Sequence, residues 1–267
     1  MKETWFRIAL GTDDGPRLVV APGPHLGAAI ELASRRLGKA WPLAAATAAP
    51  GEVPLGESVG KGVIALRDRP QKVGAFRWPR GVVAALDGGA RPTVVTGTVE
   101  RAASAGWALE AVAEGDDARE RFLSIVERLP AVDNLEVRVA AHFDGGRDDV
   151  WLTPRLSDPR RALRFLDDFE VDLLDSGHVD VAAYVRAPQS TWRLTQHKTL
   201  VWMTVDDALH ARVRGWLDEA GLPRREALPT IADGPHHHYR PAAASPRARL
   251  ETKLHRARLR KVASTPA

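Results

Sequence analysis

The segment ADGPHHHYRP, residues 232–241, gathers the side chains best suited to chemistry in this chain. Three consecutive histidines, His236 to His238, follow Asp233. Flanking prolines favour extended backbone, where side chains alternate, so His236 and His238 share a face and His237 does not. A catalytic zinc site needs three protein ligands. We therefore favour a polar connector here and expect no cofactor, with a metal site built on Asp233, His236 and His238 as the alternative.

A second group of titratable residues lies in DDFEVDLLDSGHVD, which contains His178 between several aspartates. Paired carboxylates can divide acid and base roles when their environments separate their pKa values. A run of charges is more commonly a solvated surface, which is the interpretation that we favour. The chain has no cysteine, which excludes disulfides, thiolate metal ligands and a cysteine nucleophile. It also lacks the usual phosphate-loop, nucleophile-elbow and H-E-x-x-H patterns.

The C-terminal residues carry most of the positive charge. The net charge of the whole chain is +4, yet the last thirty residues hold eight basic side chains and one acidic one. Ser245 and Pro246 resemble a helix start, and Leu250, Leu254 and Ala257 then form one apolar seam, which predicts a basic amphipathic helix over residues 246–262. The candidate partner-binding or nucleic-acid-binding residues in this segment are Arg247, Arg249, Lys253, Arg256, Arg258, Arg260 and Lys261.

These side chains must be positioned by regular elements, and the clearest pattern is strand, turn, strand, helix. It begins at residue 5 with WFRIAL and returns at Leu135 and near Val179, each time followed by a helical stripe. We expect TWRLTQHKTLVWMT, residues 191–204, to form one long strand. The sequence predicts an α+β fold with antiparallel sheets built from repeated strand-turn-strand-helix units and a C-terminal basic helix.

We expect three segments: an N-terminal α+β lobe over residues 1–115, a second lobe of two hairpin-helix units over 116–225, and an extended segment plus basic helix over 226–267. If the two later hairpins share a sheet covered by helices on one side, the other face is open and polar. The candidate binding residues on that open face are Arg138, Tyr184, Arg186, Arg193 and His197.

For function, the sequence leaves three hypotheses from different classes. We favour a non-enzymatic interaction or scaffold protein that binds a protein partner, or itself as an oligomer, through the basic helix and the open sheet face. The first alternative is nucleic-acid binding through the arginine-rich tail, and the second is a His/Asp hydrolase or metal-dependent enzyme. No apolar run is long enough for a membrane span, so we expect a cytoplasmic protein, and the arginine, alanine and proline content favours a bacterial source.

Overall fold

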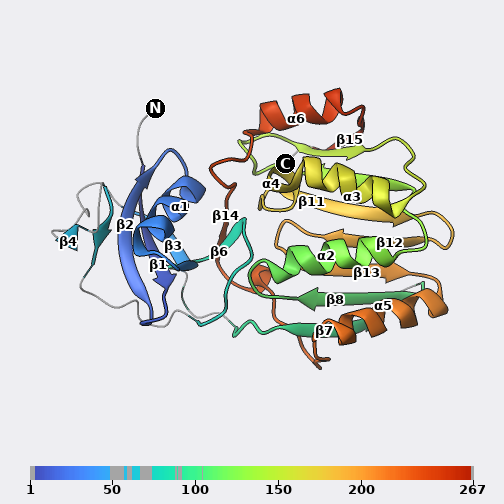
Figure 1. Cartoon of the computed structure of the whole chain (residues 1–267), viewed down its shortest axis with the longest axis horizontal. Helices are drawn as coiled ribbons and strands as arrows, with labels where there is room; N and C mark the ends of the chain where they lie inside the picture. Colours follow the sequence, from blue (N-terminus) through green and yellow to red (C-terminus); the bar gives the residue numbers. More distant parts are fainter. Residues whose placement is uncertain are drawn as a thin grey trace.

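The protein is described by a computed structural model that covers residues 4–48, 57–58, 62–66, 74–87, 89, 92–103 and 105–265. Its strands form two sheets, shown side by side in Figure 1. Nearly all strand pairs are antiparallel, the exception among the described pairs being β3 with β6. The predicted α+β class with antiparallel sheets is therefore confirmed. Among the described residues, no helix has the length and apolarity that a bilayer crossing would need.

The first sheet carries α1 (Leu26–Leu37) on one face. The predicted opening unit is present, because β1 and β2 form a hairpin that leads directly into α1. Ile8, Val19 and Ile30 are buried between the sheet and this helix. In spatial order its strands are β14 (His236–His238), β6 (Val82–Ala85), β3 (Trp41–Thr47), β1 (Thr4–Gly11), β2 (Arg17–Gly23), β5 (Ile64–Ala65) and β4 (Glu57–Ser58).

The second sheet holds the larger core. The helices α2 (Asp117–Arg128), α3 (Pro159–Asp168) and α5 (Asp207–Glu219) cover one face of it (Figure 1). Short α4 (Glu170–Leu173) follows α3. In spatial order its strands are β15 (Arg260–Thr265), β10 (Asp148–Leu152), β9 (Asn134–Val139), β11 (Val179–Val185), β12 (Ser190–Leu194), β13 (Leu200–Thr204), β8 (Trp107–Val112) and β7 (Gly97–Ala102).

The expected single strand over residues 191–204 is wrong. The chain forms two strands, β12 and β13, that pair with each other around a tight turn at Thr195–Thr199. Lys198 in this turn has a φ of 60°, a left-handed conformation that no continuous strand accommodates. The alternation of apolar residues is the same on both sides of the turn, which is why the sequence pattern alone suggested one strand.

The basic helix is present but shorter than predicted. α6 spans Arg247–Arg256, after which Arg258 adopts a φ of 65° and the chain enters β15, an edge strand paired with β10. A left-handed residue just past the last turn is a common helix terminator. The Leu259 N–H donates to the Leu254 carbonyl at 3.0 Å, and Leu259 is buried in the core, which fixes this exit.

The two sheets meet at β14, which lies in the segment over residues 226–267 that the sequence analysis treats as separate. Sheet membership changes between β6 and β7, and β14, from the expected C-terminal segment, forms the edge of the first sheet by pairing with β6. The Gly177 N–H donates to the Tyr239 carbonyl at 2.9 Å, which ties the residue after β14 to the turn before β11. The division into three segments at residues 115 and 225 stays a prediction.

Candidate metal centre

Strand β14 presents His236 and His238 on one side, as the alternation of an extended segment requires. The two residues pair with Ala84 and Val82 of β6 across the sheet edge. Their imidazole rings lie 4.9 Å apart, centroid to centroid, and their Nε2 atoms are 3.1 Å apart. The histidine triplet therefore supplies two nitrogens that converge on one point.

The opposite ring nitrogens fix the tautomers of these two histidines. His236 Nδ1 lies 2.7 Å from the Gly234 carbonyl oxygen, and His238 Nδ1 contacts the Gly177 carbonyl oxygen. A carbonyl oxygen only accepts hydrogen bonds, so each Nδ1 carries the proton and donates it. In the neutral imidazoles both Nε2 atoms then carry a bare lone pair. Two lone pairs that face each other need a proton or a cation between them.

The third nitrogen comes from His197 in the turn between β12 and β13. Its ring lies 5.0 Å from that of His236 and 4.8 Å from that of His238, and the ligand atoms of all three residues lie within 4.8 Å of one another. Tetrahedral zinc with Zn–N bonds of about 2.0–2.1 Å sets its ligands about 3.3 Å apart. The Nε2 atoms of His236 and His238 are already close to that spacing, and the His197 ligand atom lies within 4.8 Å of both.

A buried lysine holds the turn that carries His197. Lys198 is 3% exposed, and its Nζ donates to the carbonyls of Leu174 at 2.8 Å and Ser176 at 2.6 Å. Burial lowers the pKa of this ammonium to about 8, and the nearby Asp175 opposes that shift. Lys198 thus connects the His197 turn to residues 174–176. The next residue, Gly177, accepts the hydrogen bond from His238 Nδ1.

Two glycines allow the sheets to approach at this point. A Cβ on Gly177 would overlap the Gly81 carbonyl, and a Cβ on Gly81, whose φ is 94°, would overlap the backbone of residues 175–177. The Gly81 carbonyl also accepts the Tyr239 N–H at 2.7 Å. Only a residue without a side chain fits on either side, so the position of His238 against Gly177 depends on both glycines.

Two more histidines, His142 and His178, lie beside the three convergent ones. The His142 ring lies 4.4 Å from the His238 ring and 5.0 Å from that of His178, which stacks on Phe143. Burial is the main cause that lowers the pKa of His142 and His197, and it lowers the pKa values of His178 and His238 to about 3. The rings of His142, His178, His197 and His238 therefore stay neutral at physiological pH, which is the form that binds a metal ion.

A pocket of about 520 Å³ opens beside this cluster. It is lined by residues 140–142, Gly145, Gly146, Asp148 and Gln196. Gln196 precedes the ligand candidate His197, and His142 packs on His238. A cavity of this size accommodates a small molecule.

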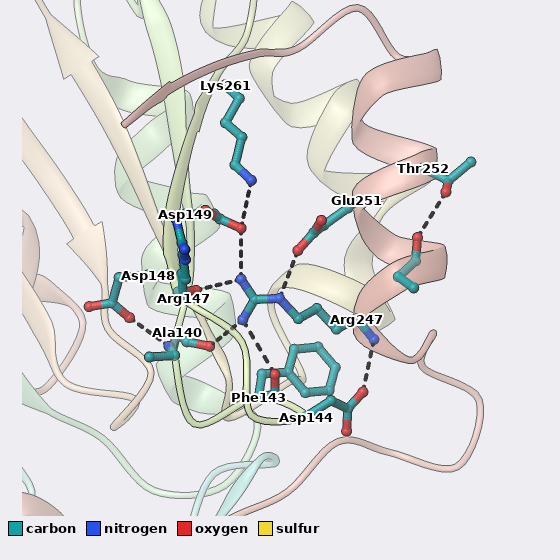
Figure 2. A network of polar contacts seen from close by, with 12 residues as sticks. Ala140, Phe143, Asp144, Arg147, Asp148, Asp149, Arg247, Glu251, Thr252 and Lys261 are labelled. Carbon is teal, nitrogen blue, oxygen red and sulfur yellow. Dashed lines mark hydrogen bonds and ion pairs between the residues drawn. The ribbon is translucent and has the colours of Figure 1, made fainter. Parts of the chain in front are cut away.

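Arg247, the first residue of α6, supports the loop that lines this pocket (Figure 2). It is 8% exposed, and its guanidinium donates to the carbonyls of Ala140 and Phe143, at 2.8 and 3.3 Å, and to that of Arg147. The carboxylates of Asp149 and Glu251, both at 2.7 Å, neutralise it. The Arg247 charge is therefore neutralised inside the protein. The guanidinium lies against Gly146, and a Cβ at position 146 would overlap it.

The other predicted site residues lie in different places. Asp233 is not part of the cluster; its carboxylate accepts from the Thr230 N–H at 2.7 Å in a capping box. Arg138 and Arg186 are exposed, and Tyr184 and Arg193 are partly buried on the sheet face opposite the helices, where Arg193 pairs with Glu136 at 3.3 Å. Of that group only His197 reaches the histidine cluster.

The basic residues of the tail have two kinds of surroundings. Lys253 pairs with Asp172 at 2.6 Å and Lys261 with Asp149 at 2.8 Å, so these two, like Arg247, bind the body of the protein. Arg249, Arg256, Arg258 and Arg260 are exposed. The apolar seam of Leu250 and Leu254 is buried in the main core.

Sequence reasoning missed His197 as a ligand candidate, along with Lys198, Gln196 and Asp148. The signal that was present is the polar stretch TQHKT between two apolar alternations, which is typical of a hairpin turn. Comparison with known proteins found no matching family model, no similar curated protein and no similar solved structure.

Proposed function

We propose that this protein is a metal-dependent enzyme of the hydrolytic class, with His197, His236 and His238 as its metal ligands. The observation that carries the proposal is the pair of Nε2 atoms 3.1 Å apart in His236 and His238, whose Nδ1 protons are both directed at carbonyl oxygens. Histidine ligands that donate their other N–H to a backbone carbonyl are the usual arrangement around a protein metal ion.

The donor set favours one group of metals. Imidazole nitrogens suit zinc, copper, nickel and iron, whereas magnesium and calcium prefer oxygen ligands. Three protein ligands with a fourth position open to water are typical of catalytic zinc sites, while structural zinc sites are closed by four protein ligands. Zinc is therefore the metal that we expect.

A metal ion in such a site lowers the pKa of a bound water to about 7, which makes a nucleophile available at neutral pH. The protein's part is to hold the three imidazoles in place. The Gly177 and Gly234 carbonyls orient two of the rings, and Lys198 holds the turn of the third. The pocket beside the cluster has room for a small substrate.

Metal content tests the first part of the proposal. An untagged protein should bind one equivalent of Zn²⁺ or Co²⁺, as measured by plasma mass spectrometry after dialysis. His197→Ala, His236→Ala and His238→Ala should each weaken binding strongly. His237→Ala is the matched control, since this neighbour points to the other face of β14. Equal loss in the His237 variant, or no metal uptake by the parent, would contradict the proposal.

The open position is tested by spectroscopy. The Co²⁺ form should show the visible absorption of a four-coordinate or five-coordinate site, and azide or acetohydroxamate should change that spectrum by replacing bound water. A Co²⁺ spectrum that neither ligand alters would indicate a closed structural site and contradict an enzymatic role.

An interaction role for the tail is a second proposal. It is supported by the outward position of Arg249, Arg256, Arg258 and Arg260, which leaves four cationic side chains available to an acidic protein or to nucleic acid. Exchanging all four for glutamine should abolish salt-sensitive binding to a fluorescent oligonucleotide without changing the melting temperature. Unchanged binding would exclude this surface.

A further inference from the structure

The pocket beside the histidine cluster has a distinct polarity. Its charged wall residue is Asp148, whose Oδ1 accepts the Ala141 N–H at 2.6 Å and which approaches His142 closely enough to influence its pKa. Gln196 adds a carbonyl oxygen, Oε1, that is buried and has no hydrogen-bond partner within the described part of the chain. Both groups are acceptors, so this wall is suited to a ligand that donates hydrogen bonds.

Among the described residues that line the pocket, none is a lysine or an arginine; the exposed Arg147 lies between Gly146 and Asp148 in the sequence but does not line it. The guanidinium behind Gly146 belongs to Arg247, and it is already bonded to two carboxylates and three backbone carbonyls. The Asp180 carboxylate lies on the other side of Gln196, where it accepts the Gln196 N–H at 2.6 Å. A ligand with a positive group is therefore favoured over one with a second negative group.

The pocket lies next to the proposed metal ligands, although none of the three lines it. Gln196 is joined to His197 through one peptide bond, and the His142 ring packs 4.4 Å from that of His238. A molecule in the pocket thus contacts Asp148 and Gln196, and also the His142 ring that packs on the ligand candidate His238.

We propose that this pocket is the substrate site, and that Asp148 and Gln196 select compounds that carry a protonated amine close to a hydrolysable carbonyl, as in an amino-acyl amide or ester. This inference rests on the proposed metal centre. The ammonium group would donate to the Asp148 carboxylate and, after a rotation of the Gln196 side chain, to its Oε1, and the carbonyl carbon would lie on the side of the proposed metal ligands. Asp148 is a specificity residue in this scheme, because it recognises a part of the substrate that does not react.

Two hydroxamates that differ by one amine test this inference without knowledge of the natural substrate. Acetohydroxamate and glycine hydroxamate bind a metal through the same two oxygens, and only the second carries an amine. Titration of the Co²⁺ protein with each compound should show that glycine hydroxamate binds at least about tenfold more tightly, as expected for a charge-assisted hydrogen bond in a partly desolvated site. Equal affinities would overturn the inference.

Variants locate the source of the preference. Asp148→Asn keeps an oxygen that accepts the Ala141 N–H, so it should fold, yet it removes the charge and should bring the two hydroxamates to nearly equal affinity. Asp167→Asn, an exposed site on α3, removes the same charge elsewhere and should keep the preference. A preference that survives in the Asp148 variant would overturn the assignment of this residue.

The two proposals fail in different ways. A protein that takes up no Co²⁺, or whose Co²⁺ spectrum responds to neither hydroxamate, would overturn the proposed metal enzyme and this inference with it. A spectrum that responds equally to both compounds would leave the metal centre supported and overturn the amine specificity alone.

Discussion

Lys198 is the residue on which the arrangement of the histidines depends most directly. Its ammonium is buried and donates hydrogen bonds to two backbone carbonyls. Its backbone adopts the left-handed conformation that the turn with His197 requires. A buried lysine is costly, since desolvation disfavours its charge. Here the cost is offset by hydrogen bonds that join the His197 turn to the segment that orients His238.

We expect Lys198→Met to weaken metal binding by roughly 10- to 100-fold, the usual effect of removing a group that orients ligands. Chelator competition measures this, and the Co²⁺ spectrum should shift because the His197 ring is no longer held. Lys253→Met removes an ion pair that is 40% exposed on the lysine side and should leave both readouts unchanged. Identical metal affinity in the Lys198 variant would show that the lysine only stabilises the fold.

Gly177 is the second residue on which the arrangement of the histidines depends, because its backbone packs directly against Gly81 and contacts His238. Gly177→Ala places a methyl group on the Gly81 carbonyl, so we expect it to separate β14 from this turn and to lower the melting temperature and metal affinity together. Gly215→Ala is the matched control, because a Cβ there contacts nothing within 4 Å in the middle of α5. That exchange should raise the free energy of unfolding by about 1 kcal/mol through helix propensity. Unfolding in urea compares the two, and a neutral Gly177→Ala would contradict the contact.

At the scale of elements, α6 belongs to the body of the protein and also serves the pocket. Leu250 and Leu254 are 1% and 0% exposed and pack in the main core, and Arg247 holds the loop over residues 140–147 from the same helix (Figure 2). β15, which follows, adds an edge strand to the second sheet. Removal of residues after Ala244 should therefore unfold part of this core.

Single substitutions in α6 should separate its buried face from its exposed one. Leu250→Ala or Leu254→Ala should each lower the free energy of unfolding by about 2–5 kcal/mol, as buried leucine truncations do. Arg249→Ala and Arg256→Ala, on the exposed face, should change it by less than about 0.5 kcal/mol. Denaturant titration measures all four. Small effects at both leucines would mean that the helix is not part of the core in solution.

At the scale of the whole molecule, the candidate metal centre spans both sheets. His236 and His238 belong to β14, the edge strand of the first sheet, and His197 lies in the turn between β12 and β13 of the second. A bound metal therefore links the two, and anything that binds only the folded state stabilises it. Neutral histidines at this junction also make the metal-free protein sensitive to acid.

We expect the chelator-treated protein to lose stability as the pH falls below about 6.5. Burial lowers the folded-state pKa of His142, His178, His197 and His238 below the value in an unfolded chain. The unfolded state therefore binds more protons in acid, and the stabilisation present at neutral pH is lost as pH falls. His178 and His238, with pKa values of about 3, each contribute at most about 1.4 kcal/mol per pH unit. Urea midpoints between pH 7 and 5 test this, and constant midpoints would contradict it.

The sequence by itself determined many of the local elements and the fact that His236 and His238 share one face of an extended segment. Apolar alternation and turn residues identified the hairpin of β1 and β2 and the α+β class. These features depend on residues a few positions apart, whose periods of 2 and 3.6 follow from backbone geometry. The same alternation placed His236 and His238 on one side of β14 before any contact was known.

Only the tertiary structure decided which residues meet those two histidines. His197 joins them because β14 pairs with β6 at the edge of the first sheet while Lys198 and Gly177 fix the turn and backbone of the second. Such contacts join segments far apart in the sequence, and their selection depends on how whole faces pack, which no local pattern contains. For the same reason the charge of Arg247, conspicuous in the sequence as part of a basic tail, proved to be enclosed by carboxylates and carbonyls.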